Sequence, residues 1–420
     1  MAPNKNLSVV CIFKSLFHTL TINHSWQIDQ IYVKPIMKNI VIIGGGPGGV
    51  AAAQNAAKSL SSKEAKITLL EKRSFFFHAP GSLRAMVDTS FIPKILIPYD
   101  NVFSKYPNVE LKFATVDSIA YDAKTVTFTS TATSSGPQET ISYDYLIIAT
   151  GSSYPSPIKP TGAVSSTQDI ERDLTQAAKD IKKSERILVV GGGAVGIEMA
   201  GELKAFYPDK KIMLLDSHHE LLSNQNVPKL REPVKQALLK HGVELFLGQR
   251  LKERFTSHQF GTKSLVTEAG LTIESDAQLV CVGMKPNIDL MKDPECLDGG
   301  RSIKVTATMQ VDHPSADYEH VFVLGDASNH PTPKLAYWAM DQGKHLGMSI
   351  AKNILNGKDI KPYAAPSAEA LFLPLGPGGG VGQLPMFSGI LIGNFLTRVF
   401  KSKDLLAGMF WKDFNVKMPA

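Results

Sequence analysis

Short apolar runs, each followed by a glycine-rich turn, mark the predicted strands of this chain. The run at 39–43 is mostly apolar and β-branched, as in a parallel strand that is buried on both faces. A turn at 44–49 comes next, then an alanine-rich segment at 50–57 that favours a helix, then a second apolar run at 66–70. This order predicts a βαβ unit with parallel strands.

The same pattern returns later in the chain. An apolar run at 186–190 leads into a turn at 191–196, a helical segment at 197–204 and a further apolar run at 211–215. Because the elements recur in the same order, they indicate a duplication at the scale of a domain. We therefore expect an α/β fold with two Rossmann-like dinucleotide-binding domains.

The remaining segments are shorter and richer in strands. The pattern predicts, in order, a hairpin strand, a polar turn, a buried strand and a Ser/Pro-rich linker at 125–129, 130–137, 145–149 and 152–162. From Tyr363 onwards we expect a small C-terminal α+β region. Its loop at 376–382 is rich in glycine but lacks a strand before it and a helix after it, so we interpret it as a flexible turn.

Gly44, Gly46 and Gly49 form the first dinucleotide fingerprint. The first glycine permits a tight turn, the second leaves room for a pyrophosphate beside the backbone, and the third lets the helix pack close to the strand. The helix N-terminus then faces the phosphates with its partial positive charge. Glu71 follows at about the 20-residue spacing of an acid that binds ribose hydroxyls. A tight turn without a ligand is the alternative.

The second fingerprint consists of Gly191, Gly193 and Gly196, with Asp216 as its acid. An acid at this position repels a 2′-phosphate, so we expect NADH to be preferred over NADPH. The histidines at 218–219 follow directly and weaken this expectation, because a histidine could meet a 2′-phosphate or could be a plain surface residue.

Length and composition agree with a multidomain globular protein. The chain has 420 residues, 43% hydrophobic and 20% charged, which indicates two or three domains. The net charge of +6 is mild, and the sequence lacks long Lys/Arg runs and zinc-finger spacing, so we expect no dedicated nucleic-acid site and no metal site. Cys11, Cys281 and Cys296 form no close pair, which excludes a disulfide framework and indicates an intracellular context. We interpret Cys281 as core filling.

Further motifs follow in an order typical of one family. They are Ala149-Thr150-Gly151 at a strand end, the segment Val282 to Asn287, and Val323-Leu-Gly325-Asp326. With the two fingerprints they make the chain resemble the two-dinucleotide-binding-domain flavoproteins, which include the pyridine nucleotide–disulfide reductases. The resemblance implies FAD as a bound cofactor and NADH or NADPH as a co-substrate.

A closer likeness, over roughly 38–415, is to the apoptosis-inducing-factor-like and ferroptosis-suppressor-like flavoproteins. The matching segments are 75–78, 82–85, 195–200, 333–337, 380–383, 402–405 and 411–412. By this resemblance Asp326 binds the FAD ribityl chain, Arg84 and Val116 join the FAD site, and Glu198 lies near the nicotinamide as a catalytic residue. The cofactor-binding residues are then Gly44, Gly45, Gly46, Pro47, Gly48, Gly49, Glu71, Lys72, Arg84, Val116, Ala149, Thr150, Gly151, Gly191, Gly193, Gly196, Asp216, Gly283, Gly325, Asp326, Leu335 and Ala336.

Lys334 is the second predicted catalytic residue. A reduced flavin carries negative charge near N1 and the C2 oxygen, so a cation and a helix N-terminus beside it stabilise that form. Pro333 precedes this lysine, and we expect a helix to begin there. A surface lysine after a turn is the alternative.

The acceptor must be external, because residues 72–100 lack the cysteine pair through which disulfide reductases pass electrons. We expect a quinone. The alternatives are reduction of a redox protein or of oxygen, and a cell-death signalling or DNA-binding protein in which FAD is structural. The sequence leaves the oligomeric state open.

Two segments bear on location. Phe387 to Phe414 mixes apolar residues with Arg398, Lys401 and Lys403, which suits a helix on an anionic membrane, where a lipid quinone could be met, or a domain packed on the flavin domain. Residues 1–36 could be a targeting peptide, a disordered tail or an artefact of the start codon, and the second residue, Ala2, does not allow N-myristoylation. We expect a cytoplasmic protein, associated with a membrane or lipid-droplet surface, with a mitochondrial location as the alternative.

These inferences divide the chain into consecutive segments. We expect an N-terminal extension, a first part of the FAD-binding domain, an inserted NAD(P)H-binding domain, a second part of the FAD-binding domain and a C-terminal domain. Their predicted ranges are 1–36, 37–160, 161–285, 286–360 and 361–420.

Overall fold

A computed structural model shows how the two predicted βαβ units are completed by distant segments. The structure describes residues 37–131, 136–161, 166–223, 225, 227–365, 369–386 and 389–420. The expected N-terminal extension at 1–36, with Cys11, and Phe387 lie outside the described residues.

The first sheet has seven strands in the order β18-β8-β1-β2-β5-β6-β7. Their bounds are β1 Lys38–Ile43, β2 Ala65–Glu71, β5 Val109–Ala120, β6 Thr125–Ser130, β7 Gln138–Ser142, β8 Tyr145–Ile148 and β18 Val321–Val323. β1 pairs in parallel with β2 and β8, and β18 adds in parallel to β8, while β5, β6 and β7 form an antiparallel extension. The buried strands β1 and β8 are the apolar runs of the sequence, because a strand between parallel neighbours is covered on both faces.

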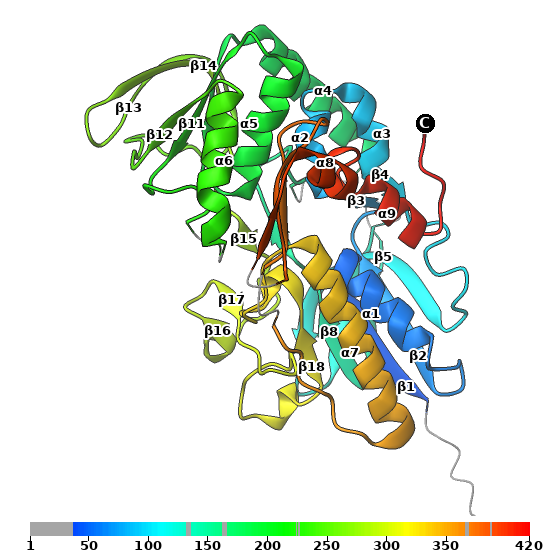
Figure 1. The fold of residues 1–420 in the computed structure, drawn as a ribbon. Helices are drawn as coiled ribbons and strands as arrows, with labels where there is room; N and C mark the ends of the chain where they lie inside the picture. Colours follow the sequence, from blue (N-terminus) through cyan, green and yellow to red (C-terminus); the bar gives the residue numbers. More distant parts are fainter. Residues whose placement is uncertain are drawn as a thin grey trace, which may run out of the picture. The chain divides into compact units, whose positions relative to one another are not determined.

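Helix α1 (Pro47–Ala57) lies beside the long helix α7 (Ala336–Asn356), which comes from the far end of the sequence (Figure 1). Glycines allow the close approach of the two helices. A Cβ atom on Gly343 would lie 2.1 Å from the Gly48 carbonyl oxygen, and one on Gly347 would lie 2.4 Å from the Ala52 carbonyl oxygen. The first βαβ unit is thus covered by a helix from a distant part of the sequence, and nothing in the sequence near the unit predicts this contact.

The second sheet has five strands in the order β12-β11-β10-β14-β13. The strands are β10 Arg186–Val190, β11 Lys211–Asp216, β12 Val243–Leu247, β13 Gln259–Val266 and β14 Thr272–Val280, and the helices are α4 Thr167–Lys183, α5 Ala194–Phe206 and α6 Pro228–Lys240. β10 pairs in parallel with β11 and β14, as in the first unit, and β13 is an antiparallel edge strand. Every strand of this sheet comes from one continuous stretch of chain.

Two crossover segments join the sheets. Strand β9 (Ser152–Ser153) pairs antiparallel with β15 (Lys285–Pro286). The smaller elements are β3 Phe75–Phe77, α2 Ser82–Ala85, α3 Ile92–Ile95, β4 Leu96–Pro98, β16 Leu297–Asp298 and β17 Ser302–Ile303.

The C-terminal region is a three-stranded antiparallel sheet followed by short helices. It comprises β19 Leu371–Pro374, β20 Gly380–Leu384, β21 Ile390–Ile392, α8 Asn394–Thr397, a π-helix at Arg398–Ser402 and α9 Ala407–Asp413. The expectation of a flexible turn over 376–382 was wrong in its second half, since β20 begins at Gly380, where a side chain would collide with the Leu373 carbonyl oxygen at 2.1 Å. The glycines there serve close strand packing.

The segment after residue 389 packs onto β3 and α3, which follow the first βαβ unit in the chain. A C-terminal domain packed in this way was one of the two expected arrangements. The rings of Phe76 and Phe414 stack with centroids 5.0 Å apart, and the Trp411 indole N–H donates to the Lys94 carbonyl oxygen at 2.9 Å. The prediction of a single surface helix over 387–414 was wrong for the described part of that segment. The helical structure there is interrupted at Leu405 and Leu406, which have positive φ angles of 54° and 67°. Within the described residues, no helix is long and apolar enough to span a bilayer.

Candidate functional site

The first glycine turn has the geometry of a phosphate cradle. Gly44 has a φ angle of +105°, and a Cβ atom on Gly49 would lie 1.9 Å from the Gly44 carbonyl oxygen, so both positions require glycine. A Cβ atom on Gly46 would have no protein atom within 4 Å. The middle of the turn therefore faces open space into which a ligand can approach the backbone.

Glu71 organises this first cradle. One carboxylate oxygen accepts the Gly45 N–H at 2.7 Å, and the other accepts the Arg73 N–H at 3.0 Å. The buried Tyr99 hydroxyl donates to the Gly45 carbonyl oxygen at 2.7 Å, and burial raises the pKa of Tyr99 well above its usual value, so it stays a donor. Glu71 and Tyr99 together fix the peptide groups on both sides of Gly45.

The second turn repeats this geometry. Gly191 has a φ angle of +122°, and a Cβ atom on Gly196 would lie 1.8 Å from the Gly191 carbonyl oxygen, whereas one on Gly193 would again meet no atom within 4 Å. Asp216 accepts the Gly192 N–H, as Glu71 accepts that of Gly45. The two cradles are therefore built on the same hydrogen-bond plan.

Asp216 differs from Glu71 in its second partner. Its other oxygen accepts the His218 N–H at 2.8 Å and also lies 2.8 Å from the His218 Nδ1. The His218 side chain is 60% exposed, while that of Asp216 is 12% exposed. The acid is thus covered on one side by an exposed side chain that a bound ribose could displace.

Both cradles fit a dinucleotide phosphate. The N-caps of α1 and α5 are Gly46 and Gly193, and neither helix receives a side-chain hydrogen bond there, so the first N–H groups remain available to an anion. One guanidinium nitrogen of Arg73 is buried without a hydrogen-bond partner among the described residues. A buried donor of this kind costs about 1–3 kcal/mol unless a ligand satisfies it.

The strand-end motif after β8 lies at the crossover. Ala149 donates its N–H to Ile43, and the Thr150 hydroxyl donates to the Asn287 carbonyl oxygen at 2.6 Å. Asn287 returns a hydrogen bond from its amide to the Thr150 carbonyl oxygen at 2.8 Å, and Gly151 adopts a φ angle of +66°. The two segments that run between the sheets are therefore hydrogen-bonded to each other next to the C-terminal end of β1.

Asp326 follows β18 and faces the same crossover. Its Oδ2 accepts the Ser152 hydroxyl at 2.6 Å. Gly325 before it has a φ angle of +68° and donates its N–H to Gln342 of α7 at 2.7 Å. The fold thus brings Asp326 of the predicted motif 323–326 against Ser152, the residue that follows the motif 149–151.

Lys334 is partly buried rather than on the surface. Its ammonium donates to the carbonyl oxygens of Ser328 at 2.7 Å and His330 at 3.1 Å, and burial lowers its pKa. Helix α7 begins at Ala336 with Leu335 as its N-cap, so the expected helix start at Pro333 was wrong. The reason is that the chain from 328 to 334 folds around the lysine before the helix begins.

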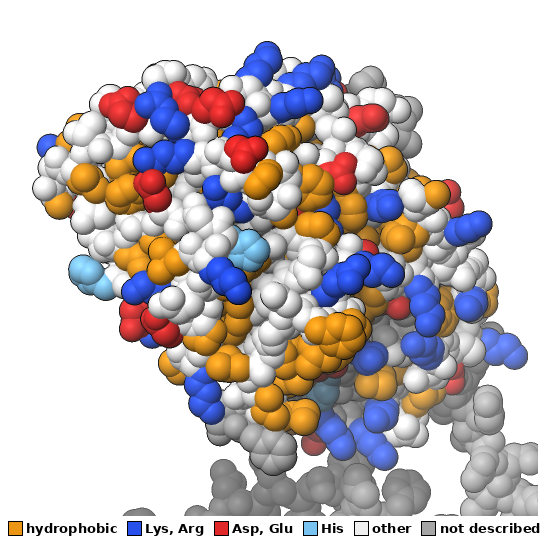
Figure 2. Space-filling model, turned by 45° about the horizontal axis from the view of Figure 1, so that its top comes forward, with side chains coloured by type: hydrophobic (Ala, Val, Ile, Leu, Met, Phe, Trp, Pro, Cys, Tyr) orange, Lys and Arg blue, Asp and Glu red, His pale blue; other side chains and the backbone are white. Residues whose placement is uncertain are grey.

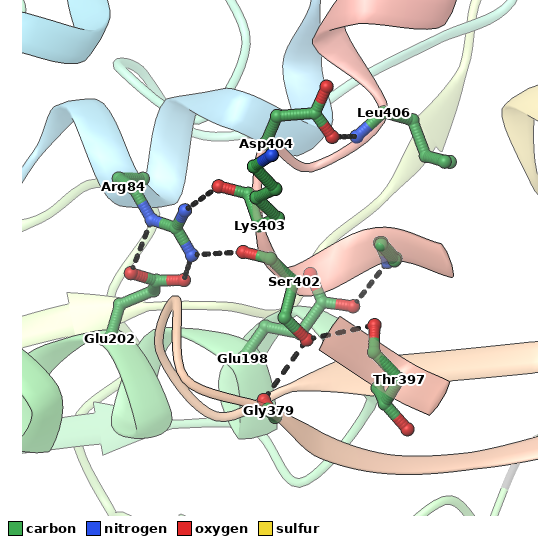
Figure 3. Close-up of polar contacts among 10 residues, drawn as sticks. Arg84, Glu198, Glu202, Gly379, Thr397, Ser402, Lys403, Asp404 and Leu406 are labelled. Atoms are coloured by element: carbon green, nitrogen blue, oxygen red, sulfur yellow. Dashed lines mark hydrogen bonds and ion pairs between the residues drawn. The ribbon is translucent and has the colours of Figure 1, made fainter. Parts of the chain in front are cut away.

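Arg84 is buried and joins three parts of the chain (Figure 3). Its guanidinium forms a bidentate pair with Glu202 of α5, with N–O distances of 2.6 and 2.9 Å. It also donates to the carbonyl oxygens of Ser402 at 3.0 Å and Lys403 at 3.1 Å. In this structure Arg84 therefore ties α2, α5 and the C-terminal segment, and its role in an FAD site remains a prediction.

Glu198 also meets the C-terminal segment. Its carboxylate accepts the Lys401 ammonium at 2.7 Å, and that ammonium donates as well to the Phe372 carbonyl oxygen at 3.1 Å. Burial raises the pKa of Glu198, and the ammonium opposes that shift. Its predicted place near the nicotinamide stays a prediction, with Lys401 as a partner that the sequence did not reveal.

The other predicted residues lie around these groups. Val116 is at a bulge in β5, Lys72 is exposed after β2, and Gly283 is exposed after β14 with a φ angle of +86°. Sequence reasoning missed Arg73, although its place two residues after the acid was a usable signal. It also missed Tyr99, which no local pattern links to the glycine turn.

A mixed cluster of Asp293, Cys296 and His313 places ligand-type atoms within 4.8 Å of one another. The His313 Nδ1 accepts the Ser315 N–H at 3.1 Å, so a neutral ring carries its proton on Nε2. That nitrogen faces Glu295 at 3.3 Å and Asp293 at 3.6 Å. The arrangement favours a hydrogen-bonded histidine over a metal ligand, whose second nitrogen normally donates.

The described cysteines are not a redox pair. Cys281 and Cys296 are free and buried, and burial raises the pKa of Cys281 to about 12. A thiol that stays protonated is a poor nucleophile. Cys281 lies in the core, as its sequence context predicted.

Comparison with known proteins extends over most of the chain. The profile of a family described as pyridine nucleotide-disulphide oxidoreductase matches residues 38–343. Ferroptosis suppressor protein 1 of Taeniopygia guttata is 33% identical over 390 residues, covering 91% of this chain and 97% of that protein. Apoptosis-inducing factor homolog B of Dictyostelium discoideum is 30% identical over 407 residues, covering 91% of this chain and 98% of that protein.

Solved structures share the fold. The sulfide:quinone oxidoreductase of Aquifex aeolicus superposes with a TM-score of 0.70 at 18% identity, covering 90% of this chain and 92% of that one. At this identity the likeness concerns the fold alone, and it confirms the expectation of two Rossmann-like domains.

Proposed function

Since the chain belongs to the pyridine nucleotide-disulphide oxidoreductase family, we propose that it carries electrons from NADH or NADPH through FAD to a quinone. FAD and NAD(P)H are the cofactors of this oxidoreductase family, and the chain is an oxidoreductase. The proposal adds the acceptor and the residues. The observation that carries it is the presence of two glycine cradles, each with an acid on its second glycine, and no cysteine pair at 72–100.

The first cradle suits the resident FAD. The Tyr99 hydroxyl holds the Gly45 carbonyl oxygen of this cradle, and the glycines of α7 pack on α1, the helix that begins in the cradle. A cofactor held by segments from so many parts of the chain leaves slowly. The second cradle is closed by Leu222, in the loop after its acid, and packs on the segment at 281–282; it has an exposed histidine on its acid, which suits a dinucleotide that exchanges.

FAD, when bound, accepts a hydride from the nicotinamide and passes its electrons on. The residues of this chain bind and orient. Asp216 would accept hydrogen bonds from the adenosine ribose of NADH, and the N-terminus of α5 would bind the pyrophosphate. Glu198 would orient the nicotinamide, and Lys334 would add positive charge at the flavin ring.

A membrane would bring a lipid quinone to the C-terminal region. Phe395 is 75% exposed, Val399 is 62% exposed, and Met386 is 51% exposed, which is unusual for large apolar side chains. The exposed Arg398 and Lys403 lie in the same segment and would contact anionic lipid head groups. Figure 2 shows a face of the molecule on which hydrophobic side chains gather among lysines and arginines.

The test is an anaerobic titration of the purified, FAD-loaded protein with NADH, followed by addition of a quinone. NADH should bleach the flavin, and a quinone should restore its colour. Rates with ferredoxin or oxygen in place of the quinone should be much lower. A flavin that NADH does not reduce would defeat the proposal and would support a structural FAD.

The membrane part needs its own measurement. Sedimentation with vesicles containing anionic lipid should retain the wild type and lose the Phe395→Ser/Val399→Ser variant, and both proteins should reduce a soluble quinone equally. Equal binding of both proteins to the vesicles would contradict a role for this apolar surface.

A further inference from the structure

A lysine outside both glycine turns contacts the groups around Asp326, the carboxylate that is predicted to bind FAD. Lys159 lies after β9, in the segment that leads from the first sheet to the second, and donates to the Ser152 hydroxyl oxygen at 2.8 Å and to the Ser152 carbonyl oxygen at 3.1 Å. The Ser152 hydroxyl in turn donates to Asp326 Oδ2 at 2.6 Å. The Lys159 ammonium lies 3.7 Å from that same Oδ2.

This chain of contacts is largely shielded from water. The side chain of Lys159 is 25% exposed, and that of Asp326 is 18% exposed. The Lys159 ammonium also lies 5.5 Å from the centre of the Tyr154 ring. Burial lowers the pKa of Lys159, and Asp326 opposes that shift. An ammonium is retained in such a place only where a negative charge compensates for its lost hydration.

The consequence for Asp326 is a fixed orientation. Oδ2 is occupied by a hydroxyl and faces a cation, whereas Oδ1 accepts no hydrogen bond from the described residues. Since the two oxygens of a carboxylate are fixed relative to each other, holding Oδ2 aims Oδ1. The free oxygen is the one that can accept a hydrogen bond from a ligand.

We propose that Lys159 is a positioning residue of the flavin site, which acts through Ser152 to orient Asp326 and to offset its negative charge. The inference rests on the proposed function, in which Asp326 binds FAD. It assigns a role to the crossover between the domains, because Ser152 also belongs to β9, which pairs with the returning strand β15.

The charge balance gives the inference a signature. A reduced flavin is negatively charged, and an uncompensated Asp326 beside it would disfavour the reduced form. Removing the Lys159 ammonium should therefore make the flavin midpoint potential more negative. It should also speed FAD release, because a carboxylate that is free to rotate holds its ligand less well.

The experiment uses the FAD-loaded full-length protein and needs neither NADH nor an acceptor. FAD release is followed by flavin fluorescence, and the midpoint potential is measured by dithionite titration with a reference dye. Lys159→Met should release FAD roughly tenfold faster, the size expected for a hydrogen bond to a charged group, and should lower the potential. Lys159→Arg keeps the positive charge and should leave the FAD release rate and the potential close to those of the wild type. Lys105→Met, at an exposed lysine, should change neither.

A second pair of variants tests whether Lys159 acts through Asp326. Ser152→Ala should speed FAD release in the same direction as Lys159→Met, and this variant serves if Lys159→Met does not fold. In an Asp326→Asn background, loaded with FAD, Lys159→Met should no longer speed FAD release, because no carboxylate is left to orient. Wild-type release rates in both Lys159→Met and Ser152→Ala, or an undiminished acceleration in the Asp326→Asn background, would overturn the inference. A wild type that binds no FAD would instead defeat the proposed function.

Discussion

The two glycine cradles share one plan, but they are assembled from different parts of the chain. In both, an acid accepts the N–H of the second glycine, and a third glycine packs on the carbonyl oxygen of the first. The carbonyl oxygen of the second glycine has a different partner in each cradle. In the first cradle it accepts the hydroxyl of Tyr99, which lies far along the chain. In the second cradle it accepts the N–H of Leu222, in the loop after the acid.

Under the proposed function, the turn motif provides phosphate binding, and the groups that close each turn set how long the dinucleotide stays bound. A cradle closed by distant segments opens only when those segments separate, which suits a resident cofactor. The loop with Leu222, which holds the second glycine of the second cradle, can open by local motion, although α5 itself is tied to distant segments through Glu198 and Glu202. The following variants test this contrast.

The largest expected effect comes from the third glycine of each turn. Gly49→Ala places a methyl group 1.9 Å from a backbone oxygen, so the protein should purify without FAD. Gly196→Ala makes the same collision at 1.8 Å in the second cradle, so that variant should keep its yellow colour and lose reduction by NADH. Absorbance spectra before and after NADH distinguish the outcomes. Loss of FAD from both variants would mean that the cradles are not separate sites.

The next effect concerns the pair that joins the regions around the two cradles. Arg84→Met leaves the buried Glu202 carboxylate without its partner and should cost about 3–5 kcal/mol in the free energy of unfolding. Chemical denaturation measures this, and Arg84→Met/Glu202→Leu should recover most of it. Arg172→Met, at an exposed ion pair with Asp169, is the control and should cost far less stability than Arg84→Met. A small loss in Arg84→Met would mean that Glu202 finds another partner or a proton.

Acid should weaken the packing of the C-terminal segment, because the Nε2 atom of the buried His78 lies 2.7 Å from the Leu405 carbonyl oxygen. Burial lowers the pKa of His78 to about 4, from 6.5 in the unfolded chain. The neutral ring is therefore favoured on folding, so its contribution is complete above pH 6.5 and is lost as the pH falls towards 4, by about 3 kcal/mol in total. The melting temperature of His78→Phe should fall less over this range than that of the wild type, whereas His241→Gln, at an exposed histidine, should follow the wild type. Parallel curves for His78→Phe and the wild type would contradict this.

Asp216→Ala should act on the second cradle alone. Losing the acceptor for the ribose hydroxyls should raise the KM for NADH about tenfold or more, and the KM for NADPH much less, because a carboxylate repels a 2′-phosphate. FAD content should stay at the wild-type level. Equal changes for both nucleotides would defeat the role assigned to this acid.

The smallest expected effect is at the distant closure of the first cradle. Tyr99→Phe keeps the ring that packs on Phe414, with centroids 5.4 Å apart, and removes only the hydrogen bond to Gly45. FAD affinity should drop by about 1 kcal/mol, which equilibrium binding to the apoprotein can measure. An unchanged affinity would show that packing alone closes the cradle.

The same contrast explains what the sequence could predict. The strands, turns and helices of both units follow from periodicity and glycine spacing, which are local properties. The partners Tyr99, Glu202 and Lys401 lie far from the residues they contact, and nothing near them in the sequence marks that contact. The glycines at 380–382 were misread because closely packed strands and flexible turns both favour residues without side chains.

The position of β18 in the first sheet has a consequence for synthesis. All strands of the second sheet precede residue 281, whereas β8 remains an open edge until Val321–Val323 leaves the ribosome. The domain proposed to bind the exchanging nucleotide can therefore fold first, and the cofactor proposed for the first cradle can be captured only after β18 has emerged. Until then, the apolar edge of β8 is free to pair with other chains. A nascent chain that stalls in this interval is expected to aggregate whatever the supply of flavin.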